Sequence, residues 1–132
     1  MPEVIVRHDP VIFLRVGRIF VSRFRDEIRR IVAEELNIPE RKDAWLTPDD
    51  VIVRFEPHGP DDAGCWPIQI RIEAMYFPER AANKEERSVR ISERIMNSDQ
   101  CGQCLKGLLS NAPSKRRGFV WLVLPEAAFS SF

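Results

Sequence analysis

The chain has 132 residues, 44% of them hydrophobic and 30% charged, with 20 basic and 20 acidic side chains. This length and balance are typical of one globular domain, residues 1–132, with a single core. A formal net charge of zero argues against nucleic acid or an anionic membrane as a partner. No apolar run is long enough to cross a membrane, and the start does not resemble a signal peptide, so we expect a cytoplasmic protein.

The chain opens with residues 1–7, MPEVIVR, whose alternation predicts a β-strand. Removal of Met1 would leave the nitrogen of Pro2 as a secondary amine. A free α-amino group titrates near pH ~8, and an apolar wall or a nearby cation lowers that pKa. Pro2 would then be a general base poised near neutral pH on a rigid strand. The alternative is that Met-Pro is an ordinary start and Pro2 only precedes a strand.

Further strands and helices follow in a repeated order. Two long segments have the spacing of amphipathic helices, and three short segments have the patterns of strands. The predicted elements are a helix over 14–36, a strand over 51–56, a strand over 68–74, a helix over 83–108 and a strand over 119–124. The last strand is apolar on both faces, which predicts burial on both. Val89 belongs to the apolar set of the second helix, and His8 and His58 are interpreted as loop residues.

The order is β-α-β followed by β-α-β, in halves of about 1–58 and 65–125 with a tail over 125–132. A right-handed crossover makes the strands within each half parallel. The expected fold class is α/β in the broad sense (α+β by its mixed sheet). It consists of a four-stranded mixed sheet with two helices on one face. Two architectures share this order, a ferredoxin-like split sandwich and a sheet of two β-α-β units related by a pseudo-twofold axis. The periodicity does not choose between them.

Met1-Pro2 opening directly into a strand, the doubled β-α-β order and a short aromatic tail together resemble the tautomerase superfamily. The layout is most similar to the branch of macrophage migration inhibitory factor and 5-carboxymethyl-2-hydroxymuconate isomerase, over nearly the whole chain. Residues 77–81, FPERA, stand where that family often has a glycine-rich turn. The resemblance implies a homotrimer with its sheets turned inward. It also implies a cofactor-free reaction in which Pro2 moves a proton within a small keto or unsaturated carboxylic acid.

Candidate substrate-binding residues follow from the same resemblance. In that fold the end of the third strand runs antiparallel beside the start of the first, so Glu73 and Tyr76 fall nearest to Pro2. Arg71 lies further back along the same strand, and the linker before the second strand brings Lys42. An arginine can hold a carboxylate through two hydrogen bonds. The alternatives are that Arg71 forms an ordinary salt bridge and that Tyr76 is a half-buried aromatic at a strand end.

Other parts of the chain suggest a different function. Cys101 and Cys104 form a C-x-x-C pair, which can serve redox chemistry or half of a zinc site. The pair comes late in a helical stretch, and no further ligands stand at a matching spacing, which favours a structural role and no metal. The second hypothesis for the whole chain is a noncatalytic oligomeric binding protein, ferredoxin-like or tautomerase-like. It would bind a partner through its exposed sheet or through Phe129 and Phe132.

Overall fold

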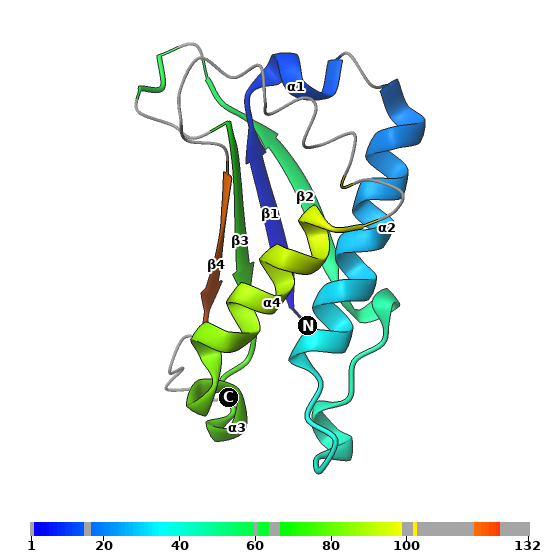
Figure 1. The fold of residues 1–132 in the computed structure, drawn as a ribbon, viewed down its shortest axis with the longest axis vertical. Helices are drawn as coiled ribbons and strands as arrows, with labels where there is room; N and C mark the ends of the chain where they lie inside the picture. The colour runs from blue at the N-terminus through cyan, green and yellow to red at the C-terminus, as the bar shows by residue number, and fades with distance from the viewer. Residues whose placement is uncertain are drawn as a thin grey trace, which may run out of the picture.

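The computed structural model describes residues 2–14, 17–59, 61–63, 67–98, 102 and 118–124. All four predicted strands are present, and each is six residues long. Their bounds are β1 Glu3–His8, β2 Ile52–Pro57, β3 Ile68–Glu73 and β4 Gly118–Val123. They form one sheet in the order β2-β1-β3-β4 (Figure 1).

The pairing of the strands decides between the two predicted architectures. β1 runs parallel to β2, and β3 runs parallel to β4, while the central pair of β1 and β3 is antiparallel. In a ferredoxin-like sandwich the β-α-β unit is split, so that another strand separates the two parallel partners. Here the parallel partners are direct neighbours. The predicted four-stranded mixed sheet is confirmed, and the ferredoxin-like alternative is wrong.

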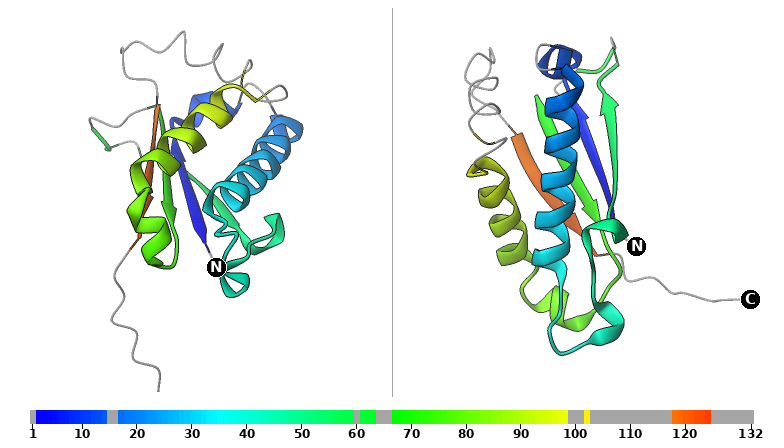
Figure 2. Two further views of the ribbon diagram at one scale, coloured as in Figure 1. Left: turned by 60° about the horizontal axis from the view of Figure 1, so that its bottom comes forward. Right: turned by 90° about the vertical axis from the view of Figure 1, so that its right-hand side faces the viewer.

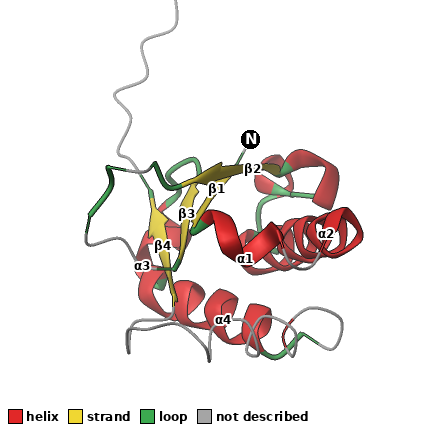
Figure 3. Ribbon diagram, turned by 90° about the horizontal axis from the view of Figure 1, so that it is seen from above, coloured by secondary structure: helices red, strands yellow, loops and turns green. Residues whose placement is uncertain are grey.

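Two long helices, α2 and α4, connect the strands within the two units. Both cover the same face of the sheet, as Figures 1 and 3 show. The bounds of the helices are α1 Pro10–Leu14, α2 Gly17–Leu36, α3 Pro78–Ala82 and α4 Lys84–Met96. The helix predicted over 14–36 is therefore preceded by a separate short helix. Gly17, at a φ of 76°, starts α2 in a conformation that residues with a side chain avoid. The sequence analysis did not predict α3.

The hydrophobic core lies between the sheet and these helices. Alternate residues of the central strands face the core, as expected for strands with one covered face. Val4 and Val6 of β1 and Ile68, Ile70 and Ile72 of β3 are at most 3% exposed. The inward set predicted for β3 is confirmed.

Four phenylalanines close the core near the ends of β1 and β2 that are furthest from Pro2. They are Phe13 of α1, Phe20 and Phe24 of α2, and Phe55 of β2. The ring centroid of Phe24 lies 5.8 Å from Phe20, 5.9 Å from Phe13 and 6.3 Å from Phe55. His8 joins them with its ring edge on Phe13, at a centroid distance of 4.5 Å. His8 is thus a buried residue of β1, and its interpretation as a loop residue is wrong, because the strand continues one residue beyond the alternating segment.

The opposite face of the sheet carries no helix of the described residues (Figure 2), and we call it the open face. The strand register places Ile52, Glu3, Glu73 and Val123 in one row across it and Arg54, Ile5, Arg71 and Trp121 in the next. Arg54 pairs with Glu3 at 2.5 Å, and Arg7 pairs with Glu56 at 3.4 Å. Trp121 is 56% exposed. The prediction that the fourth strand is buried on both faces is therefore wrong for a single copy, because nothing described in this chain covers the second face.

Arginines from the second half of the chain hold the C-terminal end of α2. This helix ends in Glu34, Glu35 and Leu36 and has no basic residue in its last turn, although the negative end of a helix dipole favours cations there. Arg90 of α4 pairs with Glu35 at 2.8 Å, and Arg94 pairs with both glutamates. These ion pairs join α2 to α4 across the two β-α-β units.

The second long helix departs from its prediction at one side chain. Ile91 and Ile95 are buried, whereas Val89 is 55% exposed, because it lies on the side of α4 that turns away from the sheet. α4 ends at Met96, so Asn97 and Ser98 are not helical as predicted, and beyond them only Gly102 of the predicted helix is described. The cysteine pair Cys101 and Cys104 and the aromatic tail residues lie outside the described residues.

Candidate active site

Pro2 immediately precedes the central strand β1, at the end of the sheet marked N in Figure 1. Its carbonyl accepts a hydrogen bond from the backbone amide of Ile52, at 3.0 Å. Continuing the strand register by one residue places Val51 beside Pro2 on one side and Ala74 on the other. Val51 is 1% and Ala74 is 4% exposed, and Pro2 is itself buried. Pro2 therefore lies in an apolar setting, in which an amine would have a lowered pKa.

Two segments flank Pro2 at this end of the sheet. We call residues 74–77, which follow β3, the β3 loop, and residues 37–51, which lead into β2, the linker. Tyr76 of the β3 loop is 37% exposed. Lys42 begins a 3-10 turn of the linker, Lys42–Ala44, and is exposed. The structure thus places Tyr76 and Lys42 in the two segments that continue from the strand neighbours of Pro2.

Glu73 and Arg71 lie on the open face, and Pro2 shares the inward orientation of Val4 because neighbouring strand residues alternate. Glu73 stands directly opposite Glu3 across β1 and β3, one residue from Pro2. Arg71 is paired with Ile5, which is three residues or roughly 10 Å from Pro2 along the strand. Within one copy, the pairing of β1 with β3 places Glu73 one residue from Pro2 on the other face of the sheet, and Arg71 lies further away.

Arg71 differs from the two other arginines of the open face. Arg7 and Arg54 each form an ion pair with a glutamate, whereas Arg71 forms no ion pair with any residue that the structure describes. Its guanidinium carbon lies 5.7 Å from the ring centroid of Trp121, within range of a cation–π contact. The salt bridge considered for Arg71 is not formed among these residues, so its charge is available to an anion.

Sequence reasoning missed Arg80, which connects the segments around Pro2. Its side chain is 2% exposed, and it donates hydrogen bonds to the carbonyls of Leu36 at 2.9 Å, Met75 at 3.0 Å and Ala44 at 3.4 Å. Burial lowers the pKa of Arg80 from its ordinary value, and the charge of Arg87 lowers it further. Arginine is almost never fully buried, so nothing in the sequence predicted this burial.

Arg41, also in the linker, forms an ion pair with a residue of α3. It donates to the carboxylate of Glu79 at 2.9 Å. A backbone hydrogen bond at Glu79 and this bond from Arg41 lower the pKa of the Glu79 carboxyl, so it is ionised at neutral pH. Arg41 therefore ties the linker to α3, which leaves Lys42 as the linker cation that no described carboxylate holds.

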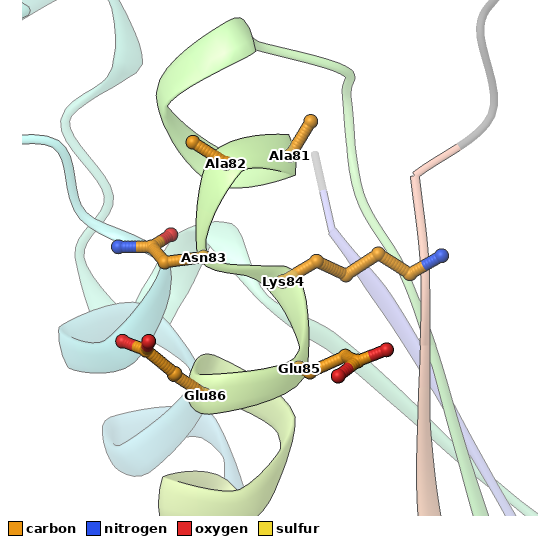
Figure 4. A pocket seen from close by; sticks show the side chains of 6 residues that line it. All are labelled: Ala81, Ala82, Asn83, Lys84, Glu85 and Glu86. Carbon is orange, nitrogen blue, oxygen red and sulfur yellow. The ribbon is translucent and has the colours of Figure 1, made fainter.

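A surface hollow at the junction of α3 and α4 is lined by residues 81–86. In Figure 4 the side chains of Asn83 and Glu86 point to one side and those of Lys84 and Glu85 to the other, so they converge on no common point. Among the described residues, no group of three or more His, Cys, Asp or Glu side chains is placed to hold a metal ion. None of the helices in the described ranges is long and apolar enough to span a membrane.

No protein-family model matches the sequence, and no curated protein matches it significantly. Solved structures match nearly the whole chain. MIF2 of Leishmania major is 14% identical, with 98% of this chain and 93% of that chain covered, at a TM-score of 0.53. A 5-carboxymethyl-2-hydroxymuconate delta-isomerase is 11% identical, with 100% of this chain and 87% of that chain covered, at a TM-score of 0.55. The chain has the tautomerase fold. The predicted resemblance is confirmed at the level of the fold, and Pro2 immediately precedes the first strand of this tautomerase fold.

Proposed function

We propose that the protein is a cofactor-free tautomerase in which Pro2, freed by removal of Met1, is the general base. The observation that carries this proposal is the position of Pro2 before the central strand, flanked by Val51 and Ala74, which are almost fully buried. This apolar setting favours the neutral amine at physiological pH. A neutral amine held on a rigid strand is what proton abstraction requires.

The proposed reaction moves one proton between oxygen and carbon. The Pro2 nitrogen takes the proton from the enol oxygen of a small keto or unsaturated carboxylic acid and returns it to carbon, or the reverse. No electron is gained or lost, so no redox cofactor enters the balance. The developing negative charge needs nearby donors or cations. We propose that Tyr76 and Lys42 bind the substrate carboxylate, and that Glu73, which like Arg71 lies on the open face, accepts a hydrogen bond from the substrate hydroxyl at a site shared between copies.

The open face supports self-association, which we propose takes the form of a homotrimer. Three arginines and three glutamates line this face: Arg7, Arg54 and Arg71, and Glu3, Glu56 and Glu73. A cyclic trimer brings one part of this face against a different part of the next copy, and the arginines and glutamates supply opposite charges for such a contact. In such an assembly Arg71, which lies on the face opposite to that of Pro2 in its own copy, would serve the substrate carboxylate at a site shared between copies.

The experiment begins with the mass of the mature protein, because Pro2 is an amine only if Met1 is absent. Ketonisation of phenylpyruvate is then measured for Pro2→Ala, whose kcat/KM should fall about 100-fold, the scale of general base catalysis. Pro57→Ala is the matched control, since Pro57 ends β2 at the opposite end of the sheet and its loss should leave the rate unchanged. Alkylation of the N-terminal amine should abolish the activity, and full activity after alkylation would refute the proposal.

A noncatalytic binding protein of the same fold is the second candidate. The exposure of large apolar side chains favours it, because a partner would cover them. Trp45 is 58%, Met75 is 62% and Trp121 is 56% exposed. A mature chain that keeps Met1 would support this candidate, since the nitrogen of Pro2 would then be an amide without basicity.

A further inference from the structure

Arg80 lies at the meeting point of three chain segments. Nε donates to the carbonyl of Leu36, the last residue of α2, at 2.9 Å, and Nη1 donates to the carbonyl of Met75 at 3.0 Å. Nη2 reaches the carbonyl of Ala44 at 3.4 Å. The three acceptors belong to the end of α2, to the β3 loop and to the linker.

Two of these segments flank Pro2 on opposite sides. Met75 directly follows Ala74, which neighbours Pro2 on β3, and the linker leads to Val51, which neighbours Pro2 on β2. Arg80 therefore spans, through one guanidinium, the two segments that carry the proposed substrate-binding residues. Among the side-chain hydrogen bonds of the described residues, those of Arg80 alone join the β3 loop to the linker.

The buried charge of Arg80 is compensated without a carboxylate. A buried cation is tolerated only when polar groups replace its water. The three carbonyls do so, and the ring centroid of Phe77 lies 4.8 Å from the guanidinium carbon. Because Leu36 ends α2, the negative end of that helix dipole adds to the compensation. A planar fork with five N–H donors can reach three divergent carbonyls at once, which a lysine ammonium on its single stem cannot do as well.

We infer that Arg80 is a positioning residue of the candidate site: it fixes the linker and the β3 loop relative to one another on either side of Pro2. Its catalytic consequence rests on the proposed function. The coupling of the two segments is a property of the fold and is measurable without activity.

Arg87 provides the matched control. It is 7% exposed and donates to the carbonyl of Glu35 in the last turn of α2, to the carbonyl of Asn37, the first residue of the linker, and to the side chain of Asn83. It donates to neither Met75 nor Ala44. Arg80→Lys and Arg87→Lys thus remove the same planar fork from the same helix end, and only the first uncouples the linker from the β3 loop.

The experiment is hydrogen exchange of the full-length mature protein, followed by mass spectrometry of peptides from the linker and the β3 loop. In Arg80→Lys the β3 loop and linker residues 42–51 should exchange at least about tenfold faster, as expected for the loss of charge-assisted hydrogen bonds. In Arg87→Lys, whose arginine touches the linker at the carbonyl of Asn37, these same residues should exchange as in the wild type. Steady-state kinetics with phenylpyruvate should show about a tenfold rise in KM for Arg80→Lys alone, because Tyr76 and Lys42 shift. The midpoint of the pH profile, which Pro2 sets, should not move.

Equal acceleration in both lysine variants would overturn the inference, since Arg80 would then only stabilise α2. If Arg80→Lys does not fold, the coupling is tested in the wild type instead, by measuring its hydrogen exchange in increasing but sub-denaturing concentrations of urea. The linker and the β3 loop should then open as one unit with a common urea dependence, and separate opening would overturn the coupling. Wild-type protein without any keto–enol conversion would refute the proposed function and leave the exchange result to stand on its own.

Discussion

Replacing Phe24 with alanine tests whether the aromatic cluster stabilises the fold independently of the candidate site. Phe24 is 1% exposed and lies within 6.3 Å, between ring centroids, of three other phenylalanines. Truncation of a buried phenylalanine costs ~3–5 kcal/mol of unfolding free energy. Each aromatic pair contributes roughly 0.5–1.5 kcal/mol beyond buried area, which places Phe24→Ala near the top of that range. Phe24→Leu keeps most of the volume and should cost about 1–2 kcal/mol.

Urea unfolding followed by circular dichroism measures both variants. A domain of this size is stable by about 5–15 kcal/mol, so Phe24→Ala should still fold, with a Tm lowered by roughly 12–20 °C. The slope of the unfolding transition should not change, because the surface exposed on unfolding is nearly the same. A loss below about 1.5 kcal/mol would refute the reasoning, since the ring could not then be packed among the other phenylalanines.

The same variant separates stability from chemistry. The cluster packs around His8, and Pro2 precedes the opposite end of the same strand. Below its melting temperature, Phe24→Ala should therefore keep the wild-type alkylation rate of the N-terminal amine. A changed rate in the folded variant would show that the two ends of the sheet are not independent.

Two further predictions concern the stability of the fold at low pH and the oligomeric state. A hydrogen bond from Arg30 lowers the pKa of Glu27 below its ordinary value of 4.5, so the stabilisation from this pair is complete above that pH and is lost as the pH falls through the lowered value. The urea midpoint of the wild type should fall in this acid range, and Glu27→Gln should flatten the decline; parallel curves would contradict the assignment. In light scattering, Trp121→Glu on the open face should convert the proposed trimer to monomers, whereas Trp45→Glu, in the linker, should not. A monomeric wild type would refute the proposed assembly.

The period of two in the sequence predicted the strands and their inward faces, because burial on one face of a sheet dictates alternation. It could not predict the strand order. Whether β2 lies beside β1 depends on which backbone edges pair, and alternation carries no information about that. The same limit applies to Trp121, because an apolar residue on an outer face has the same pattern whether or not another copy covers it.

The candidate site also contains residues that were expected from the sequence and one that was not. Pro2, Glu73 and Tyr76 were expected at one end of the sheet only through the resemblance to the tautomerase superfamily, which implies that the end of the third strand lies beside the start of the first. Arg80 could not be found. Its burial depends on carbonyls at positions 36, 44 and 75, which are far apart in the chain and belong to backbone that any residue type supplies. Side chains that bind backbone leave no mark on the composition of the segments they join.

The arginines at the end of α2 connect the two β-α-β units outside the sheet. The helix of the first unit ends in two adjacent glutamates, and Glu35 pairs with Arg90 and Arg94, which both belong to the second unit. The carbonyls at the same helix end are bound by Arg80 and Arg87. A chain divided between β2 and β3 would separate Glu35 from both of its arginines and the end of α2 from Arg80 and Arg87. The two β-α-β units are therefore joined by side chains at one helix end as well as by the sheet.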